Sequence, residues 1–210
     1  MQSNRFHFIC GIAVGLLFFV TACSSAPGSA STSATATSTP QPTATAVTIP
    51  AATAAFCEGL ISFTEANTII SPINPIVGVA TVNSAHTSSC QFTDAAKNVP
   101  LLLNFAYFSS GTSINTAAAN YIAQVFNYPH TAVATSHAVS GVGNQAWYIS
   151  STITGGNISA HAKVLCAAVG SFLLCITNIS MNGTALLSSV SDSVVQGEFV
   201  QVANLVISRM

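Results

Sequence analysis

A long stretch near the N-terminus limits where this chain can build a folded core. Residues 24–55 contain no charged and no aromatic side chain, and 14 of these 32 residues are Ser or Thr, interleaved with Ala and four prolines. Such a segment buries too little apolar area to offset the conformational entropy that is lost on ordering. We therefore expect residues 23–55 to be a disordered, extended tether. Residues 56–210 are left to form a single globular domain.

Residues 1–22 have the layout of an export signal. Arg5 precedes an apolar run from Phe8 to Val20 that is short for a membrane span, and small residues follow it. The sequence Val20-Thr21-Ala22-Cys23 resembles the bacterial lipobox, whose cysteine receives a diacylglyceryl group and becomes the mature N-terminus. Because two or three acyl chains anchor a protein stably, we expect Cys23 to hold the chain on the extracytoplasmic face of the cell membrane. The alternative is a plain secretory signal that is cleaved after Ala22.

Charged side chains are scarce in the segment that is expected to fold. Its eight charged residues are Glu58, Glu65, Asp94, Lys97, Lys163, Asp192, Glu198 and Arg209. The whole chain has a formal net charge of −1. Because nucleic acid and anionic surfaces are bound mainly through clustered Lys and Arg, we expect neither as a partner. Uncharged Ser, Thr, Asn and Gln must supply most of the polar surface.

Hydrophobic periodicity predicts more strands than helices in residues 56–210. Ser62-Phe63-Thr64-Glu65 has the pattern of a capping box, which predicts a helix that ends before Pro72. Apolar residues recur at helical spacing over 113–126 and over 194–206. Strands are predicted over 76–82, 88–93, 100–108, 131–139, 145–151 and 158–166, and the apolar run 164–176 indicates a buried hairpin. Consecutive strands favour an α+β domain with a twisted antiparallel sheet flanked by helices.

Four cysteines remain beyond the signal and the lipidation site: Cys57, Cys90, Cys166 and Cys175. An even number in an exported chain favours disulfides. A two-residue turn at Gly170-Ser171 would place Cys166 opposite Cys175 at a non-hydrogen-bonded position, where α-carbons approach to about 4.5 Å. Cys57 and Cys90 are then left to join each other. Free core cysteines are the alternative, whereas neither a four-cysteine zinc site nor a catalytic thiol has a supporting motif.

No set of catalytic residues stands out, so we expect neither an enzyme nor a bound cofactor. Glycoside hydrolysis and metal-assisted phosphate chemistry need converging carboxylates, but Glu65 is expected to cap a helix, and Asp192 and Glu198 to lie on a solvated helix face. No serine lies in a G-x-S-x-G motif. The histidines of the domain are His86, His130, His137 and His161. His130 and His137 would point to opposite faces of one strand, so no metal site is expected.

A glycine turn followed by two aromatic residues is the candidate binding surface. Gly141-Val142-Gly143-Asn144 lacks the third glycine and the lysine of a phosphate loop, and we interpret it as a turn between strands. Trp147 and Tyr148 follow on a strand, so one ring faces inward and the other outward. Asn144, Trp147 and Tyr148 are therefore the candidate binding residues. Packing in the core is the favoured interpretation of the two rings, and a binding surface is the alternative.

Several landmarks together resemble a known family. They are the lipobox, the Ser/Thr/Pro tether, Cys57-Glu58-Gly59-Leu60 leading to Glu65-Ala66, Ser89-Cys90-Gln91-Phe92, the turn from Val139 to Ala146, and a C-terminal helix closing on Leu205 and Arg209. In outline, residues 57–209 are similar to small bacterial lipoproteins of unknown function, which are related in layout to extracellular sensor domains of some mycobacterial serine/threonine kinases. The resemblance implies an antiparallel sheet flanked by helices and a Cys57–Cys90 disulfide, and it brings no catalytic residue. The family usually has aspartate where Asn144 stands, and a Cys166/Cys175 pair is not expected of it.

These observations predict a membrane-tethered, non-enzymatic module that binds or senses a small molecule or another envelope protein. One alternative is an envelope hydrolase with a dispersed Ser/His/Asp site that uses His137 or His161 as its base. Another is a structural surface protein that mediates adhesion through its uncharged polar face. A deep pocket would favour binding, and a flat surface would favour adhesion.

Overall fold

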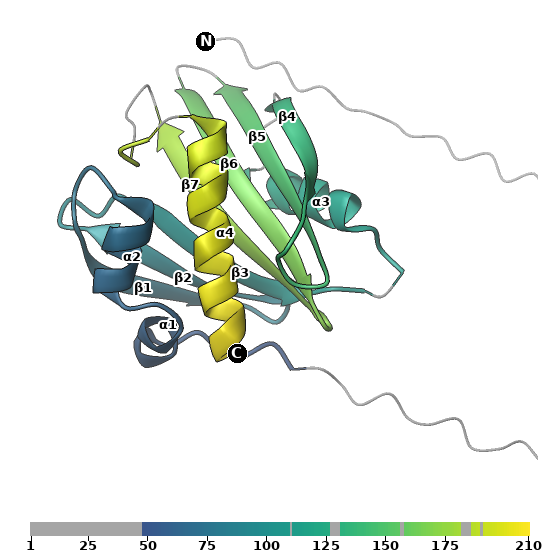
Figure 1. The fold of residues 1–210 in the computed structure, drawn as a ribbon, viewed down its shortest axis with the longest axis horizontal. Coiled ribbons are helices and arrows are strands. Elements are labelled where there is room, and N and C mark those ends of the chain that lie inside the picture. The colour runs from purple at the N-terminus through teal and green to yellow at the C-terminus, as the bar shows by residue number, and fades with distance from the viewer. Residues whose placement is uncertain (1–47, 110, 127–130, 156–157, 182–185, 190) are drawn as a thin grey trace, which may run out of the picture. The chain divides into compact units, whose positions relative to one another are not determined.

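The computed structural model describes residues 48–109, 111–126, 131–155, 158–181, 186–189 and 191–210. The predicted export signal, Cys23 and the tether up to residue 47 lie outside these ranges. Within the described ranges, seven strands form one open antiparallel sheet, and four helices pack against it (Figure 1). The predicted α+β class is confirmed.

The sheet has the strand order β1-β2-β3-β7-β6-β5-β4, and all neighbours are antiparallel. The strands are β1 (Ile76–Asn83), β2 (Thr87–Asp94), β3 (Leu101–Tyr107), β4 (Thr131–Val139), β5 (Gln145–Gly155), β6 (Ile158–Val169) and β7 (Phe172–Met181). Two meanders, β1–β3 and β4–β7, meet where β3 pairs with β7. β5 and β6 exceed their predicted lengths because their pairing runs without a break from Gln145 to Gly155.

Three of the four helices form where local sequence signals predict them. Helix α2 (Phe63–Ile70) begins at the capping box, in which Ser62 Oγ accepts from the Glu65 N–H and the Glu65 carboxylate accepts from the Ser62 N–H. Helices α3 (Ile114–Phe126) and α4 (Asp192–Arg209) occupy the two predicted amphipathic stretches. Helix α1 (Ala54–Leu60) was not among the predicted elements.

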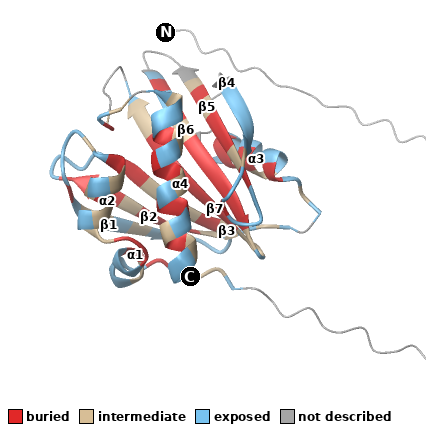
Figure 2. Cartoon of the chain, in the orientation of Figure 1, coloured by how far each residue is buried: buried red, intermediate tan, exposed pale blue. Residues whose placement is uncertain are grey.

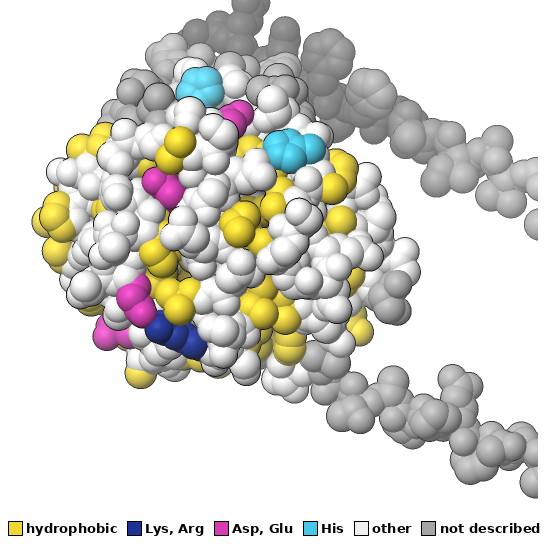
Figure 3. Space-filling model, viewed as in Figure 1, with side chains coloured by type: hydrophobic (Ala, Val, Ile, Leu, Met, Phe, Trp, Pro, Cys, Tyr) yellow, Lys and Arg dark blue, Asp and Glu magenta, His cyan; other side chains and the backbone are white. Residues whose placement is uncertain are grey.

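Buried residues lie along the strands and on the helices (Figure 2), and they form two apolar clusters, one on each face of the sheet. Helices α1, α2 and α4 lie over one face, where Phe92, Phe105 and Tyr148 are fully buried. Helix α3 packs on the opposite face of β5 and β6. We call these two sides the α4 face and the α3 face. Charged side chains are few on the α4 face, as Figure 3 shows.

Both disulfides join the cysteines that the sequence pattern paired. Cys166 and Cys175 lie opposite each other in the β6–β7 hairpin, with α-carbons 4.1 Å apart. Cys57 and Cys90 join α1 to β2. Disulfides persist in oxidising compartments, so the two bridges suggest an extracytoplasmic location. Among the described residues, no helix combines the length and apolar character needed to cross a membrane.

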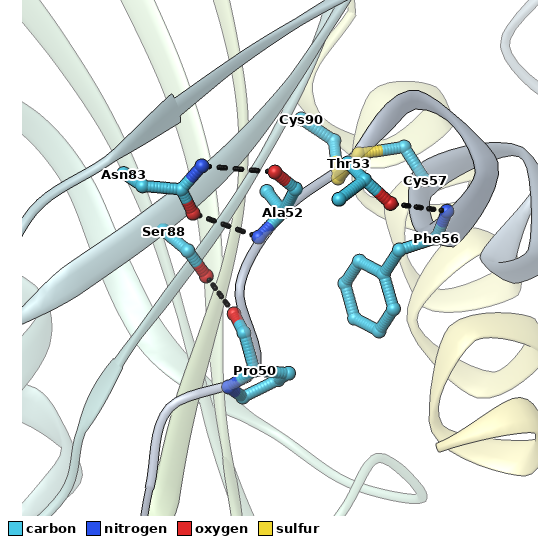
Figure 4. Close-up of a disulfide and its surroundings, with 8 residues drawn as sticks. All are labelled: Pro50, Ala52, Thr53, Phe56, Cys57, Asn83, Ser88 and Cys90. Atoms are coloured by element: carbon cyan, nitrogen blue, oxygen red, sulfur yellow. Dashed lines mark hydrogen bonds between the residues drawn. A yellow bond between two sulfur atoms is a disulfide. The ribbon is translucent and has the colours of Figure 1, made fainter.

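The ordered domain begins before residue 56, so the predicted end of the tether is too late (Figure 4). Asn83 of β1 exchanges two hydrogen bonds with the backbone of Ala52, at 2.7 and 2.9 Å. Ser88 of β2 donates to the Pro50 carbonyl at 2.8 Å, and Thr53 Oγ1 accepts from the Phe56 N–H as the N-cap of α1. Composition alone missed this segment because its partners lie more than 30 residues further along the chain.

The C-terminus of α4 is fastened to the start of α2. Arg209 Nη2 lies 2.6 Å from Glu65 Oε1, and Arg209 Nη1 donates to the Leu60 carbonyl at 3.0 Å. Hydrogen bonds from Arg209, and then from the Ser62 backbone, lower the pKa of Glu65 to about 2. Glu65 therefore caps α2 and holds the end of α4. Contacts between distant segments thus fix these two helices to each other on the α4 face.

Candidate functional site

Three charged residues gather beneath the N-terminal half of α4. Asp192 in the first turn of α4 forms an ion pair with Lys163 of β6, with Nζ 3.1 Å from Oδ1. The Lys163 side chain is only 13% exposed. Glu198, further along α4, is 8% exposed and interacts electrostatically with Lys163. Three charges in one partly buried region are unusual for a domain with eight charged residues in all.

Strand alternation explains why Lys163 reaches this place. His161 and Lys163 share a face of β6 with Leu165, which is buried in the α4-side cluster. Lys163 pairs in register with Ser150 on β5 and with Asn178 on β7. A row of polar side chains therefore crosses three central strands on the α4 face.

Asp192 connects α4 to three strands of the sheet. Besides the ion pair with Lys163, its carboxylate accepts from the Thr135 hydroxyl of β4 at 3.2 Å and from the Tyr148 hydroxyl of β5 at 3.5 Å. Burial raises the pKa of Asp192, but the hydrogen bond and charge of Lys163, with the hydroxyls of Thr135 and Ser150, outweigh burial and lower the pKa overall. Asp192 is therefore a carboxylate at neutral pH.

Tyr148 contacts the charged cluster from β5, next to β4. Its side chain is fully buried, and its ring centroid lies 5.6 Å from that of His137. His137 in turn shares a 2.8 Å hydrogen bond with Gln196 of α4. Burial, followed by the charge of Asp192, raises the pKa of Tyr148, so the phenol remains a proton donor to that carboxylate.

Beside this cluster lies a cavity of about 300 Å³. Its polar lining includes Ser150, His161, Lys163, Asn178, Ser180 and Asp192. Its apolar lining includes Leu187 and Val195. His161 Nδ1 is hydrogen-bonded to Thr152 Oγ1 at 3.3 Å, and the Asn178 amide donates to the Pro100 carbonyl at 2.9 Å. The cavity thus offers a cation, an anion and several hydroxyl groups to a small solute.

Glu198 lies in this region with an incomplete set of hydrogen bonds. Its Oε2 is buried and has no hydrogen-bond partner. Burial raises the pKa of Glu198 to about 6, although the charge of Lys163 acts in the opposite direction. Lys163 is therefore the cation next to two carboxylates, of which only Asp192 pairs with it directly.

Of the three predicted binding residues, only Tyr148 contacts the charged cluster, through its hydrogen bond to Asp192, and none of the three lines the cavity. Asn144 is exposed in its turn, where its N–H donates to the Ala168 carbonyl and its Oδ1 accepts from the Gly170 N–H. These contacts hold the β4–β5 turn against the β6–β7 turn. Trp147 is half-buried against the cluster on the α3 face. One ring therefore lies on each side of the sheet, as the alternation predicted, but both rings pack against an apolar cluster, as the core-packing interpretation expected.

The histidines of the domain lie in different surroundings. His161 lines the cavity, His137 contacts Tyr148, and His86 lies in the β1–β2 turn. His130 is outside the described residues. In the part of the chain that the structure describes, no group of three or more His, Cys, Asp or Glu side chains is arranged to hold a metal ion.

The sequence pattern did not single out Lys163, and it placed Asp192 and Glu198 on a solvated face. A usable signal was present in β6, because His161 and Lys163 are polar residues at alternate positions of an otherwise largely apolar strand. Comparison with protein-family models gave no match, and no curated protein is similar to the chain in sequence.

Proposed function

We propose that this protein is a lipid-anchored extracytoplasmic binding module, whose folded domain captures a small polar solute in the cavity beneath α4. The observation that carries the proposal is the ion pair between the nearly buried Lys163 and the partly exposed Asp192 at the edge of a concave polar site. The two disulfides and the lipobox-like sequence ending at Cys23 support an external, membrane-bound location. We also propose that the chain belongs to the small bacterial lipoproteins that it resembles, which are related in layout to kinase sensor domains.

The lining of the cavity limits the chemistry of the solute. Lys163 and Asp192 nearly neutralise each other, so the site favours neutral or zwitterionic molecules over strongly charged ones. Serine hydroxyls and the Asn178 amide suit a ligand that is rich in hydrogen-bonding groups. The volume is at the lower end of the range of about 300–1,000 Å³ for small-molecule sites. A single sugar or a free amino acid fits these limits.

Calorimetric titration of the full mature chain carrying Cys23→Ser tests this binding. Neutral sugars and zwitterionic amino acids are the probes, and Lys163→Met is expected to weaken the best of them at least tenfold. Arg209→Met is the matched control, because it removes the other ion-paired cation at the opposite end of α4. If no probe binds, or if Lys163→Met binds as tightly as the unmodified chain, the cavity is not a solute site.

The membrane anchor has its own test. Intact mass of the protein isolated from a bacterial membrane fraction is expected to show acyl groups on Cys23, and four thiols from the domain that appear only after reduction. Cys23→Ser is expected to release the protein from the membrane fraction. A mass without acyl groups would overturn the anchoring while leaving solute binding open to its separate test.

A second candidate function, hydrolysis at the same cavity, rests on one observation. His161, Ser150, Ser180 and Asp192 line a single cavity, which brings the residue types of a serine hydrolase together. However, the Asp192 carboxylate pairs with Lys163 and accepts from Thr135 and Tyr148. Turnover of a cell-wall or peptide substrate that is lost in both Ser150→Ala and His161→Ala would favour this candidate over binding alone.

A further inference from the structure

The α3 face carries a second hollow, on the opposite side of the sheet from the polar cavity. Its volume is about 660 Å³. Its apolar lining residues are Val99, Leu102, Val125, Ile179, Met181 and Leu186. The remaining lining residues are polar and uncharged, apart from Lys97. This hollow therefore combines a long apolar lining with a single positive charge.

A neighbouring hollow lies further along β3. This neighbouring hollow has a volume of about 390 Å³, and Val125 of α3 lines it as well as the larger hollow. Leu102 lines the first hollow and Asn104 and Ala106 line the second, and these residues share one face of β3. From Leu102 to Ala106 the strand covers about 13 Å, at about 3.3 Å per residue. Because the two hollows share Val125 and line the same face of β3, we refer to them together as the groove, with α3 as one wall.

The groove leaves large apolar side chains in contact with solvent. Met181 is 47% exposed and Val125 is 39% exposed. Contiguous exposed apolar surface on a soluble domain commonly marks a site that binds a ligand or a partner. Since α3 packs on β5 and β6, it borders the groove rather than filling it.

Lys97 stands at one end of the groove on a turn that is held firmly. Asp94 accepts hydrogen bonds from the Lys97 and Asn98 backbone N–H groups and from the side chains of Asn98 and Asn74. Among the described residues, Lys163 pairs with Asp192 and Arg209 with Glu65, whereas Lys97 forms no ion pair. The ammonium group is therefore available to an external anion.

We propose that this groove binds a single-chain amphiphile with an anionic head group, with its acyl chain along β3 and its head group at Lys97. Charge complementarity favours this occupant over a second copy of the chain, because an acyl chain needs only apolar contact and the head group needs one cation. A carboxylate and a phosphate head group share this chemistry, so both a fatty acid and a monoacyl phospholipid qualify. The groove lies on the opposite face of the sheet from the solute cavity, and Leu186 lines both hollows.

Calorimetric titration of the full mature chain carrying Cys23→Ser tests the proposal, with dodecanoate and monododecyl phosphate below their micelle concentrations as probes. Saturable binding at one molecule per chain is expected. Decanoate is expected to bind about 15-fold more weakly than dodecanoate, since it lacks two CH₂ groups and each buried CH₂ contributes about fourfold in affinity. Butyrate is expected not to bind. Tighter binding of the phosphate supports a phospholipid as the natural occupant, and tighter binding of the carboxylate supports a fatty acid.

Two variants separate the head-group site from the acyl site. Lys97→Met is expected to weaken dodecanoate about tenfold while leaving dodecanol unchanged, and Val125→Gln is expected to weaken both. Val194→Gln is the matched control, because it changes an exposed valine of α4 on the other side of the sheet. The proposal fails if chain length has no effect, if neither Lys97→Met nor Val125→Gln changes binding, or if sedimentation shows a dimer whose formation excludes dodecanoate.

Discussion

The ammonium group of Lys163 lies 3.1 Å from the carboxylate of Asp192, and this ion pair joins the centre of the sheet to the first turn of α4. The lysine side chain is 13% exposed and the aspartate side chain 39% exposed. The lysine of this pair is therefore largely shielded from water, whereas the aspartate is partly in contact with it. Its contribution to stability should lie between the small value of surface pairs and the large cost of breaking a buried pair.

Lys163→Met is therefore expected to destabilise the domain by about 1–3 kcal/mol, because it leaves Asp192 and Glu198 without their cation. Asp192→Asn should cost less, since the amide oxygen still accepts from one of the two hydroxyls and Glu198 remains near Lys163. The double variant should be more stable than the sum of the two single effects predicts. Urea unfolding of the four proteins measures this coupling. Strictly additive effects would show that the pair contributes nothing beyond its separate residues.

Glu198 gives the domain a pH-dependent contribution with a defined sign. Because burial raises the pKa of Glu198 to about 6 from its usual 4.5, the folded state holds the proton more tightly than the unfolded state. This contribution is fully present below pH 4.5 and is lost as the pH rises through about 6. Glu198→Gln should therefore stabilise the domain by about 1–2 kcal/mol at pH 7 and have little effect at pH 4. Unfolding at both pH values tests this, and an equal effect at each would contradict it.

The elements that the sequence predicted well are those whose signals are local. The capping box of Ser62 and Glu65 and the alternation along β3 depend on residues a few positions apart. The Cys166–Cys175 pairing followed from the two-residue turn of one hairpin. Glu198 was misplaced even though it lies three residues after the buried Val195 and four before the buried Val202, at helical spacing within the buried stripe.

The polar cavity and helix α1 could not be predicted in the same way. To predict the cavity one would need to know that α4 crosses β6 at Lys163. That arrangement depends on packing between segments about 30 residues apart. Similarly, α1 forms in a sequence with a weak helical pattern because Thr53 caps it and the Cys57–Cys90 disulfide ties it to β2. Long-range contacts, rather than local propensity, decided both features.

Residues 48–55 are expected to contribute measurably to stability. A chain that starts at residue 56 lacks the Ala52–Asn83 and Pro50–Ser88 hydrogen bonds and the N-cap of α1. Loss of the cap and of these contacts should cost about 2–4 kcal/mol relative to a chain that starts at residue 48. Thermal unfolding of the two chains provides the comparison. Equal melting temperatures would show that the domain does begin near residue 56.

The two disulfides should contribute unequally. Cys57 and Cys90 are 33 residues apart and Cys166 and Cys175 are 9 apart, so loop-closure entropy predicts losses of about 4 and about 3 kcal/mol when each pair is replaced by alanine. The difference should be wider in practice, because removing Cys57–Cys90 also frees α1 from β2. Denaturant unfolding of the two double variants measures the order, and a larger loss from Cys166→Ala/Cys175→Ala would contradict it.

Gly143 and Gly197 provide a matched test of where glycine is required. Gly143 has φ +53°, and a Cβ there would lie 2.5 Å from the Ala168 carbonyl oxygen, so Gly143→Ala must displace the β4–β5 turn from β6. We expect a loss of at least about 2 kcal/mol. A Cβ at Gly197 of α4 would instead point into open space, so Gly197→Ala should stabilise the domain by about 0.5–1 kcal/mol.

Gly141→Ala separates backbone strain from crowding, because Gly141 has φ +78° but open space around it. Unfolding free energies in the order Gly197→Ala, Gly141→Ala, Gly143→Ala, from most to least stable, are expected. If Gly143→Ala and Gly141→Ala were equally stable, the close approach of the turn to Ala168 would have no energetic role.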